Sequence, residues 1–403
     1  MDPVVIIGFG GAAVAAAEAF RAADQTTPII IVSAEPHYAY YRLRLSHLLG
    51  ESPNVTDLLI HPPEWYAARN VEVLLGRRAE SLDVAGRTVR LSGGETLRFR
   101  RLLLAQGSSA FVPPLPGADL PGVFTLRTVT DVNALYAYSR TRQDAVVIGG
   151  GVLGLEAAWA LAQKGKHVHV VEVAPYLLPK QLDERAAALL QAQGEKAGLT
   201  FHLASEVSAL AREDGLLTVS LKGKPPIRTE FVLFSIGVRP NVALAREAGL
   251  SVNRGVVVDE YMRTSAEDIY AAGDVAEYKG QVYGIWPVAK EQGKTAGLNL
   301  AGVATAYSEV VPSNYLRVFD TELFSVGDWG RGQGPYAVLT DYRLSEGVYR
   351  KVCFKEGKPV GAILCGATQA GLQVAAAIKA GWEVPAEVIQ NGDFEAFLSS
   401  LRA

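Results

Sequence analysis

The chain opens with short apolar runs separated by a helical stretch. Val4–Ile7 is entirely apolar, as in a strand of a buried parallel sheet, and glycines follow it at once. Residues 12–23 are mostly small, which is typical of a closely packed helix, and Ile29–Val32 is a second apolar run. The pattern predicts a β-α-β unit with a glycine-rich turn after its first strand.

The same pattern recurs near the middle of the chain. Residues 145–148 predict a buried strand, residues 155–164 a helix, and His167–Val171 the next strand. A glycine-rich turn again separates the first strand from the helix. The sequence therefore predicts an α/β protein with two similar units, each built on a parallel sheet.

Both turns have the glycine spacing of a dinucleotide-binding loop. The three positions are Gly8, Gly10 and Ala13 in the first unit and Gly149, Gly151 and Gly154 in the second. The first position permits a tight turn, the second lets backbone N–H groups approach a pyrophosphate, and the third lets the helix lie close to the strand. One such turn also fits an ordinary loop before a packed helix, but two complete units favour dinucleotide binding.

An acid follows the second strand of each unit. Glu35 and Glu172 stand where a carboxylate can accept hydrogen bonds from a ribose diol. Glu172 would also repel a 2′-phosphate, so the second unit is predicted to prefer NADH over NADPH. Two dinucleotides bound by one chain indicate a hydride that passes between cofactors.

Further candidate residues lie outside the two turns. Arg42 and Arg44, in a helix-like run after Glu35, could donate to a pyrophosphate or be solvated surface arginines. Asp274 follows an apolar strand and a glycine, where it could bind a sugar hydroxyl or belong to a turn. A helix is expected to begin near Pro287, and residues 311–403 look strand-rich, with a hairpin at residues 356–359 and a helix at residues 370–380.

Composition narrows the function classes. The 403 residues suggest about two or three domains, and 49% hydrophobic with 20% charged residues is typical of a soluble globular enzyme. A net charge of −3 gives no reason to expect nucleic acid or a membrane surface as a partner. The most apolar window, residues 145–162, contains four glycines and Glu156, so no membrane span is expected. With Asp2 where a basic leader would begin, a cytoplasmic location is expected.

Only two cysteines occur, Cys353 and Cys365. They are too few for a disulfide framework or for a zinc or iron–sulfur site, so no metal site is predicted. Both are expected to be small buried residues on strands of the C-terminal region, without a catalytic role.

Several segments together resemble one protein family. The two fingerprints, GVRPN at residues 237–241 and TSAEDIYAAGDVAE at residues 264–277 resemble the pyridine-nucleotide flavoprotein reductases, over essentially the whole chain. SAEPHYAYYRLRLSHLL, VNRGVVVDEYMRTS and GKPVGAILCGA resemble NADH:rubredoxin reductases and their ferredoxin-reductase relatives. The resemblance implies two Rossmann-like domains, with an FAD domain (1–115 and 240–310) split around an inserted NADH domain (116–239), and a C-terminal α+β domain (311–403).

The resemblance also implies site residues. The FAD set comprises Gly8, Gly10, Gly11, Ala12, Glu35, Arg42 and Asp274, with Trp286 and Pro287 facing the isoalloxazine. The NADH set comprises Gly149, Gly151, Gly154 and Glu172. Arg44, Ala79 and Gly237 are added as cofactor-binding residues. Glu156 would lie beside the nicotinamide as a catalytic residue, with His47 as its candidate partner.

Two departures from the family pattern matter. Residues 43–49 contain no cysteine, which argues against disulfide or peroxide chemistry that needs a thiol. His47 stands where ferredoxin-reductase relatives often have a lysine that pairs with the nicotinamide-side glutamate. A Glu156–His47 pair and a merely structural histidine both remain open.

The interpretation is an FAD-dependent NADH oxidoreductase that passes electrons to a small redox protein such as rubredoxin, as a monomer or homodimer. A flavin component of a nitrite reductase system, an NADH oxidase, and a nicotinamide-sensing flavoprotein with negligible turnover are the alternatives. Trp329 and Arg331, on a glycine-rich loop, are either contacts for the carrier or part of a solvated turn.

Overall fold

The first apolar run forms the central strand of a five-stranded parallel sheet. The structure, a computed structural model, describes residues 2–49 and 54–401. In spatial order the strands are β19 (Ile269–Ala271), β7 (Arg101–Leu104), β1 (Val4–Ile7), β2 (Ile29–Val32) and β3 (Val71–Leu74). The residues of β1 and β7 are nearly all buried, because helices and loops cover both faces of a parallel sheet. Since β19 lies late in the sequence, the chain returns to this sheet after building the second one.

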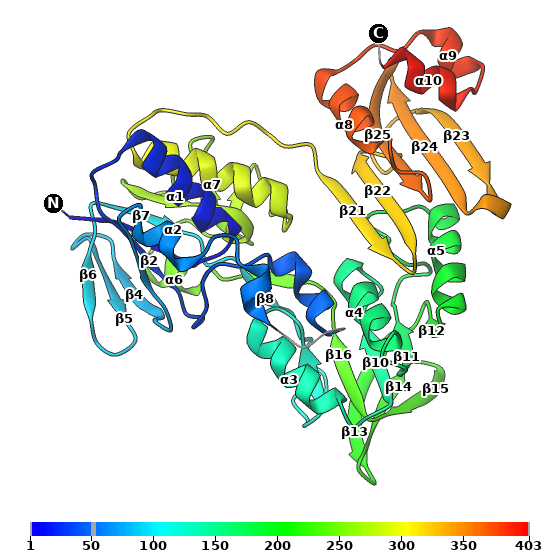
Figure 1. The fold of residues 1–403 in the computed structure, drawn as a ribbon, viewed down its shortest axis with the longest axis horizontal. Coiled ribbons are helices and arrows are strands. Elements are labelled where there is room, and N and C mark those ends of the chain that lie inside the picture. The colour runs from blue at the N-terminus through cyan, green and yellow to red at the C-terminus, as the bar shows by residue number, and fades with distance from the viewer. Residues whose placement is uncertain (1, 50–53, 402–403) are drawn as a thin grey trace.

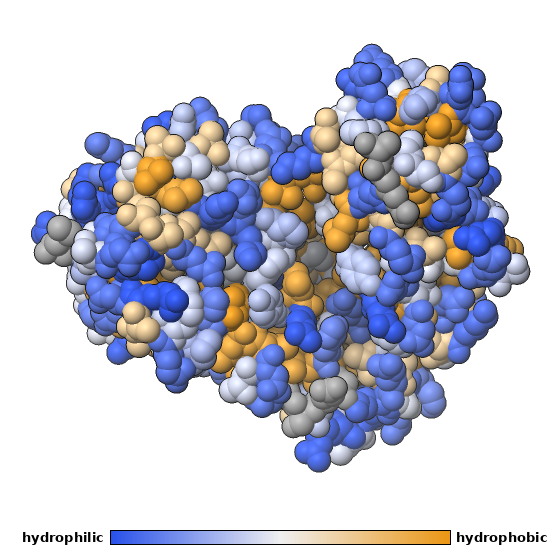
Figure 2. Space-filling model, turned by 45° about the horizontal axis from the view of Figure 1, so that its top comes forward, coloured by the Kyte–Doolittle hydropathy of each residue, from blue (hydrophilic) through white to orange (hydrophobic). Residues whose placement is uncertain are grey.

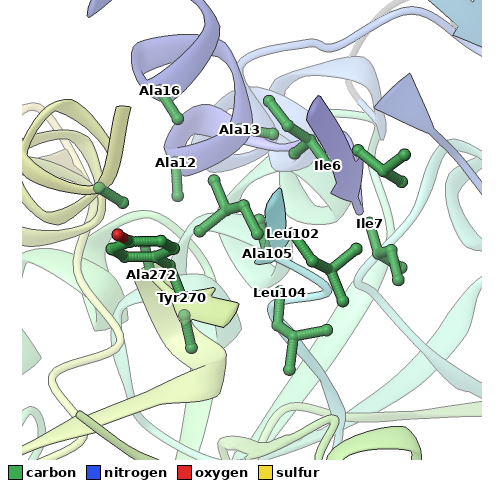
Figure 3. Packing of buried hydrophobic residues seen from close by; sticks show 14 of the residues in the cluster. Ile6, Ile7, Ala12, Ala13, Ala16, Leu102, Leu104, Ala105, Tyr270 and Ala272 are labelled. Atoms are coloured by element: carbon green, nitrogen blue, oxygen red, sulfur yellow. The ribbon is translucent and has the colours of Figure 1, made fainter. Parts of the chain in front are cut away.

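Two helices that are distant in the sequence cover one face of this sheet. They are α1 (Gly11–Ala23) and α7 (Trp286–Leu300). A Cβ atom at Gly293 would lie 2.2 Å from the backbone oxygen of Ala12, and one at Gly297 would lie 2.3 Å from that of Ala16. Figure 3 shows the alanines of α1 against the core of β1 and β7. The small residues of α1 are thus explained by close helix–helix and helix–sheet packing.

The second apolar pattern forms a second parallel sheet. Its order is β12 (Leu199–His202), β11 (His167–Val171), β10 (Asp144–Ile148), β16 (Phe231–Phe234) and β9 (Val123–Thr125). Helix α4 (Val152–Ala162) follows β10, and α3 (Val129–Ser139) and α5 (Glu184–Lys196) belong to the same unit. A three-stranded antiparallel sheet, β13 (Val207–Glu213), β14 (Leu216–Leu221) and β15 (Lys224–Thr229), packs against the other face.

Smaller elements complete the two units. They are η1 (Arg42–Leu49), η2 (Val55–Leu58), α2 (Pro63–Ala67), β4 (Ala79–Asp83), β5 (Thr88–Leu91), β6 (Thr96–Arg98), β8 (Ser108–Ala110), β17 (Val238–Pro240), α6 (Ala243–Glu247), β18 (Val256–Val258), η3 (Gly273–Val275) and β20 (Ala276–Tyr278). The helix-like run after Glu35 is a 3₁₀ helix, η1. No helix of the described residues is long and apolar enough to cross a bilayer.

The C-terminal region is an antiparallel sheet with helices. The strand order is β21 (Ser313–Val318), β22 (Thr321–Gly327), β25 (Lys358–Cys365), β24 (Val348–Lys355) and β23 (Ala337–Arg343). The short 3₁₀ helix η4 (Leu344–Glu346) and helices α8 (Gly371–Ala380), α9 (Ala386–Gln390) and α10 (Phe394–Ser400) complete it. The predicted hairpin is the β24–β25 turn, and Cys353 and Cys365 are buried free thiols on these strands, as predicted.

This C-terminal domain packs against the second unit, and Figure 1 shows an extended segment that joins it to α7. Residues of β21, β22 and β24 share one apolar cluster with α4 and α5. Trp329 belongs to that cluster and is only 7% exposed, so it is neither an open contact for a carrier protein nor part of a solvated turn. Arg331 is exposed, and its role as a carrier contact stays a prediction. The guanidinium of Arg331 lies 5.4 Å from the centre of the Trp329 ring, and the side chain donates to the backbone oxygen of Lys180.

The fold class predicted from the sequence, α/β with two Rossmann-like units and a C-terminal α+β domain, is confirmed. The domain boundaries at residues 115, 239 and 310 stay a prediction.

Candidate functional site

Both glycine-rich turns open into one cleft. Its volume is about 2710 Å³, and its walls come from both parallel-sheet units and from the C-terminal domain. Pockets for single small ligands are roughly 300–1,000 Å³, so this cleft has room for more than one dinucleotide. Figure 2 shows a central hollow with hydrophobic residues gathered along it.

The cleft brings together most residues that the sequence singled out. Those that line it are Gly8, Gly10, Gly11, Ala12, Glu35, Arg42, Arg44, His47, Ala79, Gly149, Gly151, Glu156, Glu172, Gly237, Asp274, Trp286 and Pro287. Gly154 is the exception. A Cβ atom at Gly154 would lie 2.1 Å from the backbone oxygen of Gly149, so this glycine permits close packing of α4 and does not face the cleft.

The two turns have the same geometry. Gly8 has a φ of 104°, and a Cβ there would lie 2.2 Å from the backbone oxygen of Ala105. Gly149 has a φ of 118°, and a Cβ there would lie 2.2 Å from the backbone oxygen of Ser235. These two positions therefore require glycine.

The second glycine of each turn faces open space. A Cβ at Gly10 or Gly151 would meet no described atom within 4 Å. Each residue caps the N-terminus of its helix, α1 or α4, where no side-chain cap hydrogen bond reaches the first N–H groups in the described part of the chain. An open helix N-terminus of this kind fits a pyrophosphate, which accepts hydrogen bonds and is favoured by the helix dipole.

Glu35 is oriented by its own neighbours. Its carboxylate accepts a hydrogen bond from Arg42 Nη2 at 2.6 Å and another from the Tyr40 hydroxyl at 2.6 Å. Arg42 also donates to the backbone oxygen of Arg127. The sequence predicted Arg42 as a pyrophosphate donor, but here its guanidinium holds the acid at the end of β2 in place.

Asp274 is bound from the second unit by a residue that the sequence reasoning missed. Arg127 Nη2 lies 2.9 Å from Asp274 Oδ2, and the Ser108 hydroxyl donates to the same oxygen at 2.7 Å. Burial lowers the pKa of Arg127, and the Asp274 carboxylate opposes that shift. Arg127 directly precedes the Thr128 capping box that begins α3, and nothing in this local pattern indicates a carboxylate partner far away in the chain.

The side chain of Gln106 indicates whether the cleft suits a bound cofactor. It follows β7, lines the cleft and adjoins the Gly8 turn. Its buried Oε1 has no hydrogen-bond partner among the described residues. A buried acceptor without a partner is costly, so this oxygen fits a donor supplied by a bound ligand, such as a hydroxyl, amine or imide of FAD.

The acid of the second unit is held by backbone groups. Glu172 accepts hydrogen bonds from the N–H of Gly150 at 2.7 Å and from the N–H of Ala174 at 2.8 Å. It is only 9% exposed, and it faces the cleft beside the Gly149 turn. The arrangement fixes a negative charge at the position where the sequence predicts the ribose of NADH.

Between the two turns lies a carboxyl group with an unusual environment. Burial raises the pKa of Glu156 to about 7, while a hydrogen bond from the Ser46 hydroxyl acts in the opposite direction. Ser46 Oγ lies 2.8 Å from Glu156 Oε2, and sequence reasoning had not named Ser46. His47 lines the same cleft, and its pairing with Glu156 stays a prediction.

An aromatic wall closes the first site. A Cβ at Gly11 would lie 2.8 Å from the ring of Trp286, which in turn lies 5.5 Å from the ring of Tyr41. Trp286 and Pro287 form the first turn of α7, as the position of Pro287 predicted. The N-terminus of α7 therefore reaches the same cleft as that of α1.

Comparisons with known proteins agree with this geometry. Residues 2–293 match the family described as pyridine nucleotide-disulphide oxidoreductase, and residues 312–382 match the rubredoxin NAD⁺ reductase C-terminal domain. A nitrite reductase [NAD(P)H] of Bacillus subtilis is 35% identical over 91% of this chain, which spans only 46% of that protein. The NADH-rubredoxin oxidoreductase of Clostridium acetobutylicum is 31% identical over 93% of this chain and 94% of its own. A ferredoxin reductase for the CYP199A2 system from Rhodopseudomonas palustris superposes with a TM-score of 0.91 at 26% identity, covering 100% of both chains.

Proposed function

The chain belongs to the pyridine nucleotide-disulphide oxidoreductase family, and we propose that it is an FAD-dependent NADH oxidoreductase that reduces a small one-electron carrier protein such as rubredoxin. FAD and NADH are the cofactors of this family. The observation that carries the proposal is that both glycine turns, with their acids, face one cleft. A cytoplasmic location, and a monomer or homodimer, belong to the same proposal.

Each unit has a distinct task in this proposal. The open turn at Gly10 binds the FAD pyrophosphate, Glu35 the ribose, and the Asp274–Arg127 pair a further polar part of FAD. The open turn at Gly151 and the carboxylate of Glu172 bind NADH. Bound flavin supplies the redox chemistry, since it can accept a hydride and release electrons singly. The protein contributes placement and exclusion of water.

Electrons must leave the flavin without help from a thiol. The only cysteines are Cys353 and Cys365, both in the C-terminal sheet and fully buried. Burial raises the pKa of the two thiols to about 11 and about 12, so both stay protonated near neutral pH. A direct transfer to a docked carrier is therefore the simplest exit. The match of residues 312–382 to a rubredoxin reductase domain supports such a carrier.

A second function is favoured by one comparison. The similarity to the Bacillus subtilis nitrite reductase covers nearly the whole of this chain but less than half of that protein. The chain could thus serve as the NADH-oxidising flavin component of a nitrite-reducing system whose metal centre lies on another polypeptide. An NADH oxidase and a nicotinamide-sensing flavoprotein are the remaining alternatives.

An acceptor screen tests the proposal. Steady-state NADH oxidation is measured with rubredoxin, a ferredoxin, nitrite, oxygen and a disulfide at matched concentrations. If the protein reduces a carrier, rubredoxin should be reduced fastest. Its rate should fall as the salt concentration rises, because such docking is steered by charge. Faster turnover with oxygen would establish the oxidase alternative, and no turnover with any acceptor would favour the sensor.

A further inference from the structure

Ser46 connects the two halves of the cleft. It is fully buried on η1, which comes directly after the FAD-side β-α-β unit, while Glu156 lies on α4 of the NADH-side unit. Its hydroxyl donates to Glu156 Oε2 at 2.8 Å. Leu45 and Leu48 on either side of Ser46 pack in the same apolar cluster as Leu155. Ser46 therefore has little freedom to turn away from the carboxyl group.

We propose that Ser46 is a positioning residue, which holds the Glu156 carboxylate at the junction of the flavin and nicotinamide sites so that it can accept a hydrogen bond from the nicotinamide carboxamide. The inference rests on the proposed function. The Ser46 hydroxyl is a neutral donor that reaches from the first unit to the second. The Glu156–His47 pair, which the sequence left open beside a structural role for His47, stays a prediction.

The glycine-rich turn of the second unit indicates in which direction the nicotinamide end of NADH would extend. Glu172 and Gly151 place the adenosine ribose and the pyrophosphate of NADH, and Glu156 lies on the same helix that Gly151 caps. The cleft continues past Glu156 to η1 and the FAD-side residues. A half-buried carboxylate there needs hydrogen bonds, because leaving it without them is costly.

The environment of Glu156 makes the protonation state of its carboxyl group sensitive to pH. Burial raises its pKa to about 7, and the Ser46 hydrogen bond favours the ionised form. Charged side chains from the elements that pack on α4 also line the cleft, namely Arg42, Arg44 and His47 of η1 and Arg317 of β21. A neutral donor leaves the carboxyl group able to titrate near neutrality. Only its ionised form offers both oxygens as acceptors to the carboxamide.

The test is Ser46→Ala in the FAD-loaded protein. The affinity for NAD⁺ is measured by calorimetry from pH 6 to about pH 9, and flavin reduction by NADH is followed over the same range. Loss of a hydrogen bond to the ionised form should raise the midpoint of both profiles by about one pH unit. Such a shift makes binding and reduction about fivefold weaker at pH 7 and leaves them nearly unchanged at pH 9.

Matched variants separate positioning from general damage. Ser139→Ala removes another buried serine hydroxyl, one that donates to the backbone oxygen of Tyr136, and should leave the midpoint unchanged. Ser46→Cys keeps a weaker donor and should give an intermediate midpoint. Glu156→Gln should abolish the pH dependence, and adding Ser46→Ala to it should produce no shift.

The outcomes distinguish this inference from the proposed function. An unchanged NAD⁺-binding midpoint in Ser46→Ala, with FAD retained, overturns the role of Ser46. Equal shifts in Ser46→Ala and Ser139→Ala overturn it as well. A wild-type protein whose flavin is not reduced by NADH refutes the proposed function, while the NAD⁺-binding profile still tests Ser46.

Discussion

At the residue scale, the carboxylate of Glu172 is predicted to decide which coenzyme fits. Two backbone N–H groups fix its orientation, so it cannot easily turn away from a 2′-phosphate. We expect wild-type protein to prefer NADH over NADPH by about a hundredfold in kcat/KM, which corresponds to about 2.7 kcal/mol. Glu172→Gln should lose most of this preference, because the repulsion disappears. Steady-state kinetics with both coenzymes measure it.

A nearby acid provides the control for this prediction. Glu206 also lines the cleft but is exposed and paired with Lys222, so Glu206→Gln should leave the preference intact. Equal kcat/KM values for the two coenzymes in the wild type would mean that Glu172 lies outside the ribose site.

Glu156 is expected to lower the free energy of unfolding as the pH rises. Its pKa in the folded protein is about 7, above the ordinary value of 4.5, so burial disfavours the ionised form. The cost is absent below about pH 4.5, grows as pH rises, and is complete above about pH 7. Glu156→Gln should therefore raise the free energy of unfolding by about 2 kcal/mol more at pH 8 than at pH 5. Urea unfolding of the FAD-loaded protein at both values checks this, and an equal gain at both would contradict it.

The residues that could be predicted from the sequence are those whose role is local. Gly8 and Gly149 are constrained by the turn that follows their own strand, so the fingerprint identifies them. Arg127 and Ser46 act on groups more than a hundred residues away in the chain, and no local pattern announces such a partner. The sequence predicts a site role for Arg42, which stays a prediction, and its pairing with Glu35 depends on how η1 folds back.

At the element scale, the crossing of α1 and α7 supports the proposed FAD site. Gly293→Ala should destabilise the protein by about 1–3 kcal/mol, because the new Cβ would meet the backbone of Ala12, which cannot move independently of α1. Since α1 follows the Gly10 turn and α7 begins at Trp286, FAD retention should fall too. Thermal unfolding and FAD fluorescence report both effects. Lys294→Ala, at an exposed position on α7, should change neither, and a Gly293→Ala variant that matches it would contradict the close crossing.

Elements with strong local periodicity were predictable, and those that depend on distant contacts were less so. Strands β1, β2, β10 and β11 and helices α1, α4, α7 and α8 lie close to their predicted positions. Residues 42–49 form a 3₁₀ helix in which Leu45, Leu48 and Leu49 pack against the second unit, so their pattern reflects a distant surface. Helix α5 was not predicted, although its apolar side faces β12 and the C-terminal domain.

At the scale of the whole molecule, the Asp274–Arg127 ion pair joins the two units at the proposed FAD site. Both side chains are mostly buried, and their N–O distance is 2.9 Å. Asp274→Asn should weaken FAD binding by about 1.5–3 kcal/mol, because it removes a charge-assisted acceptor and leaves Arg127 uncompensated. FAD release on dilution, followed by fluorescence, measures this. Asp259→Asn breaks an exposed pair with Arg263 and should have no effect, so equal FAD loss in both variants would contradict the assignment.

The arrangement of the C-terminal domain could not be read from the sequence. Trp329 stands among glycines and looked like part of an exposed loop, but it is buried where this domain packs on the second unit. It shares an apolar cluster with residues of the second unit that lie far away in the sequence, and the hydrophobic pattern within the loop carries no information about them.

The central claim is that electrons pass from NADH through one flavin to a carrier. Anaerobic double-mixing stopped flow tests it most directly. The FAD-loaded protein is first mixed with one equivalent of NADH and then with oxidised rubredoxin, while flavin and rubredoxin absorbance are followed together. We expect rapid bleaching of the flavin by NADH, followed by recovery of its absorbance in step with rubredoxin reduction and faster than recovery with oxygen. A flavin that NADH bleaches but that rubredoxin reoxidises more slowly than oxygen does would rule out transfer to a carrier as the main route.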